Sequence, residues 1–145
     1  MKHITQKLIL AGSLVVTSVA MAEPFDGEKI MLCANQYASE CVAGTDCTNV
    51  SPASVNLPDF FLIDTGKKLI SAAPESASTS TTAIERVEHL DGKLMLQGAE
   101  DGREGGERDG VGWSMSVVED SGNMVLTASG DGVAFVVFGA CTSMD

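Results

Sequence analysis

Residues 111–141 read VGWSMSVVEDSGNMVLTASGDGVAFVVFGAC. Apolar residues alternate with small or polar ones over 111–117 and again over 124–128, which is the period of a half-buried strand. The last run, 133–138, is apolar on both faces, as in a strand that is covered on both sides or enclosed by a barrel. The sequences DSGN and GDG separate the three runs with residues that tolerate tight hairpin turns. The stretch therefore predicts a three-stranded antiparallel meander that carries the single tryptophan, Trp113.

The remaining chain shows the same pattern of short apolar runs between turn residues. Five further strands are predicted, at residues 29–36, 60–64, 67–72, 83–90 and 93–98. Thr65-Gly66 and Asp91-Gly92 are typical of two-residue hairpin connections, and the second is the strongest hairpin signal in the chain. Residues 39–50 are predicted to form a loop, and residues 73–82 and 100–110 are predicted to be polar connections.

Helical signals are confined to one place. Ser51-Pro52 matches a helix start, with the serine as N-cap and the proline at the first helical position, and Pro58 limits that helix to one or two turns. Short strands with hairpin-length connections indicate an all-β fold, either a sandwich or a barrel. Because a meander closes most simply when its first strand pairs with its last, we expect a small antiparallel meander that closes as an up-and-down barrel or half-barrel of about eight strands.

The N-terminal 22 residues have the features of a secretory signal peptide. Lys2 and Lys7 precede a short apolar core at residues 8–20, and Ala20-Met21-Ala22 fits the small-x-small cleavage rule. The apolar core is shorter than the roughly 20 residues that span a bilayer, so no stable membrane anchor is expected. The sequence therefore predicts a signal peptide at 1–22, a single disulfide-tied β-domain at 23–145, and a periplasmic or secreted location.

The charge of the chain narrows the classes of partner. The formal net charge is −11, from 9 basic and 20 acidic residues. The predicted signal peptide holds two of the basic residues and no acidic ones, so the mature chain has 7 basic and 20 acidic residues and a net charge of −13. Such a charge argues against nucleic acid or an anionic membrane as a partner. It is compatible with a cationic protein, and also with a purely solubilising role.

Four cysteines lie in the predicted mature chain. An even number of cysteines in a small exported domain favours disulfides, and the gaps of seven, five and 93 residues do not suit a zinc site. Three pairings are possible. Cys41 and Cys47 flank a short turn-rich loop, whereas Cys33 and Cys141 lie in the predicted first and last strands, which barrel closure would bring together. We therefore predict the pairs Cys33–Cys141 and Cys41–Cys47.

Four blocks of sequence, in order PFDGEKIMLCA, NLPDFFLID, LMLQG and GWSMSV…FGACT, resemble a group of small exported bacterial proteins. The blocks are scattered over most of the predicted mature chain. The resemblance implies a bacterial periplasmic or secreted location and a conserved disulfide framework. It implies no activity, because none is attached to the group.

Residues that could carry catalysis or bind a metal are few. His89 is the one histidine outside the signal peptide, and its neighbours Glu88 and Asp91 suggest a solvated surface position rather than a catalytic base. Residues 100–110 (EDGREGGERDG) offer carboxylates for calcium, but the spacing matches no calcium-binding motif and two arginines would partly neutralise them. We therefore predict no catalytic residue, no cofactor and no metal.

The predicted barrel interior offers one further possibility, a cavity for a small apolar ligand, as in some eight-stranded barrels. Its candidate lining residues are Trp113, Met115, Phe135 and Phe138. The alternative, which the limited amount of apolar bulk favours, is that these side chains belong to an ordinary packed core. The sequence thus favours an exported, non-enzymatic protein that binds a partner or serves the cell envelope. Two alternatives stay open, an inhibitor of a cationic secreted enzyme, by analogy of fold and charge with lysozyme inhibitors, and a carrier of a small apolar ligand.

Overall fold

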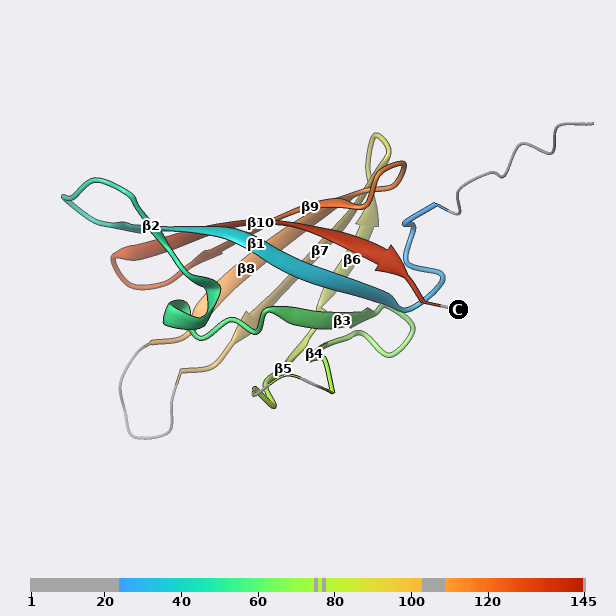
Figure 1. Ribbon diagram of the computed structural model, residues 1–145, viewed down its shortest axis with the longest axis horizontal. Helices are drawn as coiled ribbons and strands as arrows, with labels where there is room; N and C mark the ends of the chain where they lie inside the picture. The colour runs from blue at the N-terminus through green and yellow to red at the C-terminus, as the bar shows by residue number, and fades with distance from the viewer. Residues whose placement is uncertain (1–23, 75, 77, 103–108, 145) are drawn as a thin grey trace, which may run out of the picture.

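In the part of the chain that the structure describes, ten antiparallel strands form one sheet that curls into a half-barrel (Figure 1). The computed structural model describes residues 24–74, 76, 78–102 and 109–144; the predicted signal peptide and the middle of the charged 100–110 connection lie outside them. The strands are β1 (Met31–Val42), β2 (Thr48–Val50), β3 (Phe60–Asp64), β4 (Leu69–Ala72), β5 (Thr81–Ala83), β6 (Arg86–His89), β7 (Lys93–Glu100), β8 (Val111–Val118), β9 (Asn123–Ser129) and β10 (Val133–Ser143). The predicted all-β class is confirmed.

The order of the strands explains how the sheet curls. It runs β5-β4-β3-β1-β10-β9-β8-β7-β6, with β2 added beside β1. The first long strand pairs with the last, as the sequence predicts. The two ends of this order are β5 and β6, which follow each other directly in the chain: Ile84 N–H donates to Lys68 O at 2.9 Å, and Glu85 N–H donates to Gln97 O at 2.9 Å. The chain therefore passes from one end of the sheet to the other within two residues.

The number of strands and the extent of the first one differ from the prediction. There are ten strands rather than about eight, because β2 is an addition and a separate β5 precedes β6. β1 continues to Val42, where residues 39–50 were predicted to be a loop. β10 accompanies β1 along its whole length and supplies backbone partners as far as the pair Val42↔Val133. A register shift between Asn35 and Tyr37 breaks the alternation of apolar residues, which is why the sequence of β1 does not read as one strand.

The connections between the strands match the sequence prediction in part. The predicted two-residue turn Asp91-Gly92 is confirmed, with both residues at positive φ, 51° and 68°. The connection after β3 is longer than predicted, since β4 begins only at Leu69. The predicted helix is a single 3₁₀ turn, η1 (Pro52–Val55), whose N-cap is Ser51; the Ser51 Oγ atom accepts from Ser54 N–H at 3.3 Å.

Strand length divides the half-barrel into two unlike ends. β1 and β10 have 12 and 11 residues, whereas β3, β4 and β5 have five, four and three. The long strands thus extend past the short ones. We call the end to which only the long strands extend the open end; β1 and β7 end there and β8 begins there. We call the opposite end, where β1 and β7 begin, the closed end.

The closed end is filled by side chains. Its core residues are nearly inaccessible to solvent and point inward from strands on opposite walls of the half-barrel: Met31, Ile63, Leu94, Val117 and Met124. The segment that precedes β1 covers this end, because Phe25 packs against the core and its N–H donates to Glu119 O at 2.9 Å. The Thr65 hydroxyl donates to Gly27 O, which holds the same segment against the turn after β3.

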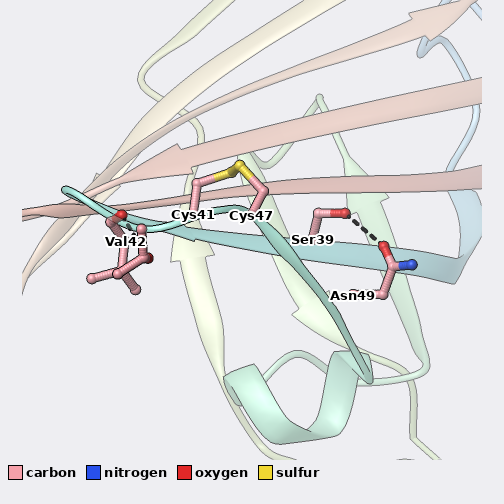
Figure 2. The surroundings of a disulfide bond; sticks show 6 residues. Ser39, Cys41, Val42, Cys47 and Asn49 are labelled. Carbon is pink, nitrogen blue, oxygen red and sulfur yellow. Dashed lines mark hydrogen bonds between the residues drawn. A yellow bond between two sulfur atoms is a disulfide. The ribbon is translucent and has the colours of Figure 1, made fainter.

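Both predicted disulfides are present. Cys33 is bonded to Cys141 between β1 and β10, and Cys41 is bonded to Cys47 across the turn between β1 and β2. Figure 2 shows the second disulfide on the outside of the open end, beside the hydrogen bond from Ser39 Oγ to Asn49 Oδ1 at 3.1 Å. Disulfides are consistent with an oxidising, extracellular compartment. In the described part of the chain no helix has the length and hydropathy needed to cross a membrane.

Candidate ligand-binding cavity

The open end contains a cavity of about 500 Å³. Its apolar walls come from the inner faces of the long strands and from β3 and β4, with a cover formed by η1 and the residues after it: Val55, Leu57, Pro58, Phe61, Ile70, Val111, Trp113, Met115, Leu126, Ala128, Val133, Phe135 and Val137. The cavity follows from the difference in strand length, because the short strands do not cover the inner face of the long ones at this end. Its size lies within the range of small-molecule sites in proteins, about 300–1,000 Å³.

Trp113 is held rigidly in the cavity wall. It is 8% exposed, and its indole Nε1–H donates to the Thr82 hydroxyl on β5 at 3.1 Å. Gly98, its cross-strand partner on β7, provides the space for the ring, since a Cβ atom at Gly98 would overlap the indole. This arrangement of an aromatic side chain over a cross-strand glycine fixes the ring against the sheet.

Asn35 supplies a polar group to the cavity wall. At the register shift in β1, its N–H donates to Asp59 O at 2.9 Å and its Nδ2 donates to Pro58 O at 2.7 Å. Its Oδ1 atom is buried and accepts no hydrogen bond from any residue that the structure describes. A buried acceptor without a donor costs free energy, and a ligand that donates a hydrogen bond to it would recover that cost.

Carboxylates lie at the open end of the cavity. Glu40, Glu100, Asp109 and Asp131 are lining residues, and all but Glu40 are exposed. Among the lining residues within the described ranges there is no lysine, arginine or histidine. The apolar cavity therefore opens through acidic side chains.

Three of the four lining residues proposed from the sequence lie together here. Trp113, Met115 and Phe135 all line the cavity. Phe138 does not: it is 47% exposed and lies on the outer face of β10, next to the exposed Tyr37 of β1. Side chains an odd number of residues apart point to opposite faces of a strand, so Phe135 and Phe138 cannot line the same cavity.

Two polar lining residues of β1 are not among the residues predicted from the sequence. Asn35 and Glu40 are five residues apart, which would place them on opposite faces of a regular strand. The register shift between Asn35 and Tyr37 restores both to the inner face, together with Cys33 and Ala38. The only signal in the sequence was a polar stretch in the middle of an apolar strand, which reads equally well as a loop.

His89 lies at the closed end, far along the strands from the cavity. Its Nδ1 atom is 2.8 Å from Glu119 Oε1, and more than half of its side chain is exposed. Its partner is thus Glu119, from the turn between β8 and β9, rather than the sequence neighbours Glu88 and Asp91. Asp91 instead lies 3.5 Å from Lys93 Nζ. The geometry is that of a hydrogen bond at the protein surface.

The charged 100–110 connection is only partly within the described residues. Its described flanks, Glu100 to Gly102 and Asp109 to Gly110, approach each other closely. No group of three or more His, Cys, Asp or Glu side chains that could hold a metal ion occurs among the residues placed by the structure. Elsewhere, backbone and side-chain hydrogen bonds from Lys67 hold the pKa of Asp64 below its ordinary value.

Comparisons with protein-family models, with curated proteins and with solved structures give no match to this chain. The resemblance to small exported bacterial proteins therefore stays an expectation from the sequence, and the cavity has to be interpreted from its own chemistry.

Proposed function

We propose that this protein binds a small, mostly apolar molecule inside the open end of the half-barrel, as a non-enzymatic binding protein or carrier. The observation that carries the proposal is the cavity of about 500 Å³, whose walls are formed by apolar side chains. Binding sites for small molecules combine such walls with a few placed polar groups that orient the ligand. Asn35 Oδ1 and the carboxylates at the opening provide those groups here.

The architecture supports binding without a large rearrangement. The long strands form most of the cavity wall, and the closed end is packed with side chains. The Trp113 ring is held in place by Gly98 and by its hydrogen bond to Thr82. A site that exists before the ligand arrives loses little conformational entropy on binding. We place this activity in the bacterial periplasm or outside the cell, in keeping with the predicted signal peptide and the two disulfides.

Inhibition of a cationic secreted enzyme is the other function that the sequence leaves open. It would use the acidic surface rather than the cavity, and it stays a prediction. A substitution of a cavity-lining residue distinguishes the two functions. It should abolish the binding of a small molecule inside the cavity, but it should leave the binding of a basic protein to the acidic surface intact.

The experiment is a titration with N-phenyl-1-naphthylamine, a neutral apolar fluorophore, followed by its own emission and by quenching of Trp113. Because Trp113 is the single tryptophan and lines the cavity, its quenching reports a ligand at this site. We expect saturable binding with one site per chain. Native mass spectrometry of protein isolated from its own periplasm or medium then identifies the natural ligand.

Two phenylalanines of β10 provide the matched variants. Phe135→Ala removes part of the cavity wall and is expected to weaken binding of the fluorophore by at least about tenfold. Phe138→Ala changes the outer face of the same strand and should leave binding unchanged. Absence of saturable binding, or an equal loss in both variants, would contradict the proposed function.

A further inference from the structure

We propose that the ligand of this cavity is a cationic amphiphile, an apolar body that carries an amine or quaternary ammonium group, and that Glu40 binds the positive charge. This inference rests on the proposed function and adds the chemical class of the ligand. Its basis is the position of one carboxylate within the cavity wall.

Glu40 points into the half-barrel. In the register of β1 it lies opposite Phe135 of β10, two residues after the buried Ala38 and therefore on the same inner face. It is half-buried and lines the cavity beside apolar residues. Strand positions that face an interior are normally apolar, so a carboxylate at this position is an exception that needs a physical reason.

The carboxylate of Glu40 has no protein partner in the part of the chain that the structure describes. No hydrogen bond or ion pair within the described ranges involves it. A partly desolvated carboxylate without a counter-charge is unfavourable, and a cation brought by the ligand would offset that cost. The cavity therefore favours a positively charged ligand over a neutral one of the same shape.

The surroundings of Glu40 favour the same sign of charge. Two exposed carboxylates, of Glu100 and Asp131, also line the opening, and no basic side chain lies among the described lining residues. Such an opening attracts cations and repels anions. The aromatic rings of Trp113 and Phe135 lie in the same wall, and aromatic faces bind ammonium groups favourably.

The second polar group of the wall suggests how the ligand is oriented. Asn35 Oδ1, which lacks a donor among the described residues, lies on the same inner face as Glu40 and roughly 15 Å further along β1 at the usual rise per residue. A ligand with its cation at Glu40 would thus extend its apolar body from the opening toward Asn35. The ligand that fits is elongated, with its charge at the end nearer to solvent.

The test compares three ligands that share a ten-carbon chain and differ only in the head group: decyltrimethylammonium, 1-decanol and decanoate. The two ionic ligands are titrated below their critical micelle concentrations and 1-decanol below its solubility limit, each into the intact mature protein, and binding is followed by Trp113 fluorescence and by calorimetry. We expect the cation to bind about tenfold or more tightly than the alcohol, and the carboxylate to bind most weakly. The preference for the cation should decrease as the salt concentration rises.

Glu40→Gln removes the charge and nearly keeps the shape. It should weaken decyltrimethylammonium about tenfold and leave 1-decanol unchanged, whereas Glu88→Gln, at an exposed carboxylate on β6, should change neither. Equal affinities for the three ligands in the wild-type protein would overturn the inference and leave the proposed function standing. Failure of all three to bind would overturn both. The wild-type comparison needs no variant, so it decides the matter even if Glu40→Gln folds poorly.

Discussion

The two ends of the half-barrel share the long strands, but side chains fill the interior at one end and leave a cavity at the other. At the closed end, side chains such as Met31 and Leu94 fill the interior, and Phe25 covers it. At the open end the long strands extend beyond the short strands β3, β4 and β5. The space that the short strands leave uncovered is a cavity with an acidic opening. The difference in strand length therefore accounts for the position of the cavity, and the polar residues Asn35 and Glu40 on the inner face of β1 give it its chemistry.

Removing each of the two disulfides should give the largest difference in stability between the two ends. Cys33–Cys141 closes a segment of 108 residues, whereas Cys41–Cys47 closes one of six. In the chain-entropy model, removing the first with Cys33→Ala and Cys141→Ala together should lower the free energy of unfolding by about 5 kcal/mol, and removing the second should lower it by about 2 kcal/mol. Urea unfolding of the two double-alanine variants measures both values. Equal losses would show that the two ends do not differ in this way.

A leucine at each end tests how well the side chains are packed. Leu94 is fully buried at the closed end, whereas Leu126 borders the cavity. Leu94→Ala should cost about 3–4 kcal/mol, because it leaves a new void among packed side chains. Leu126→Ala should cost about 2 kcal/mol, because one side of this leucine already faces empty space. Thermal and urea unfolding give the two values, and a larger cost at Leu126 would contradict the assignment of the cavity.

Two glycines near Trp113, its cross-strand partner Gly98 and its sequence neighbour Gly112, test how the tryptophan is held. Gly98→Ala places a methyl group against the Trp113 ring and the Ala83 carbonyl, so these groups must shift, which should disturb the hydrogen bond from the indole to Thr82. We expect a loss of about 1–3 kcal/mol and a red shift of the Trp113 emission. The control is Gly112→Ala, where an added Cβ meets no other atom within 4 Å. Unchanged emission in Gly98→Ala would show that this glycine does not position the ring.

The smallest effect is expected at His89. Its contact with Glu119 lies at the protein surface, so His89→Ala should change the free energy of unfolding by less than about 0.5 kcal/mol and leave ligand binding unchanged. The measurements are the urea midpoint and the fluorophore titration. A loss of function with unchanged stability would point to chemistry at the closed end, where no catalytic residue is predicted.

Much of the fold could be predicted because the strands of the C-terminal meander are regular. In β8, for example, every second residue from Trp113 to Val117 is buried, and Asp91-Gly92 forms the turn that its sequence indicates. The pairing of Cys33 with Cys141 followed from the closure of the sheet. These features depend on residues that are close in sequence, or on the one inference that the first long strand pairs with the last.

The polar part of the site could not be predicted, because it depends on one irregularity. The register shift after Asn35 adds a residue to β1 and so decides that Glu40 points inward. No local sequence pattern specifies such a shift. The misplacement of Phe138 has a different cause, since its spacing from Phe135 already excludes a shared face.

The central claim, that an apolar ligand enters the open end and not the closed one, can be tested with the methionine methyl groups. Met115 lines the cavity, whereas Met31 and Met124 lie in the packed core of the closed end. In protein labelled with ¹³C at the methionine methyls, titration with N-phenyl-1-naphthylamine should shift the Met115 resonance in a saturable manner. The resonances of Met31 and Met124 should move little. Shifts of equal size at all three methionines, or none at Met115, would contradict the account.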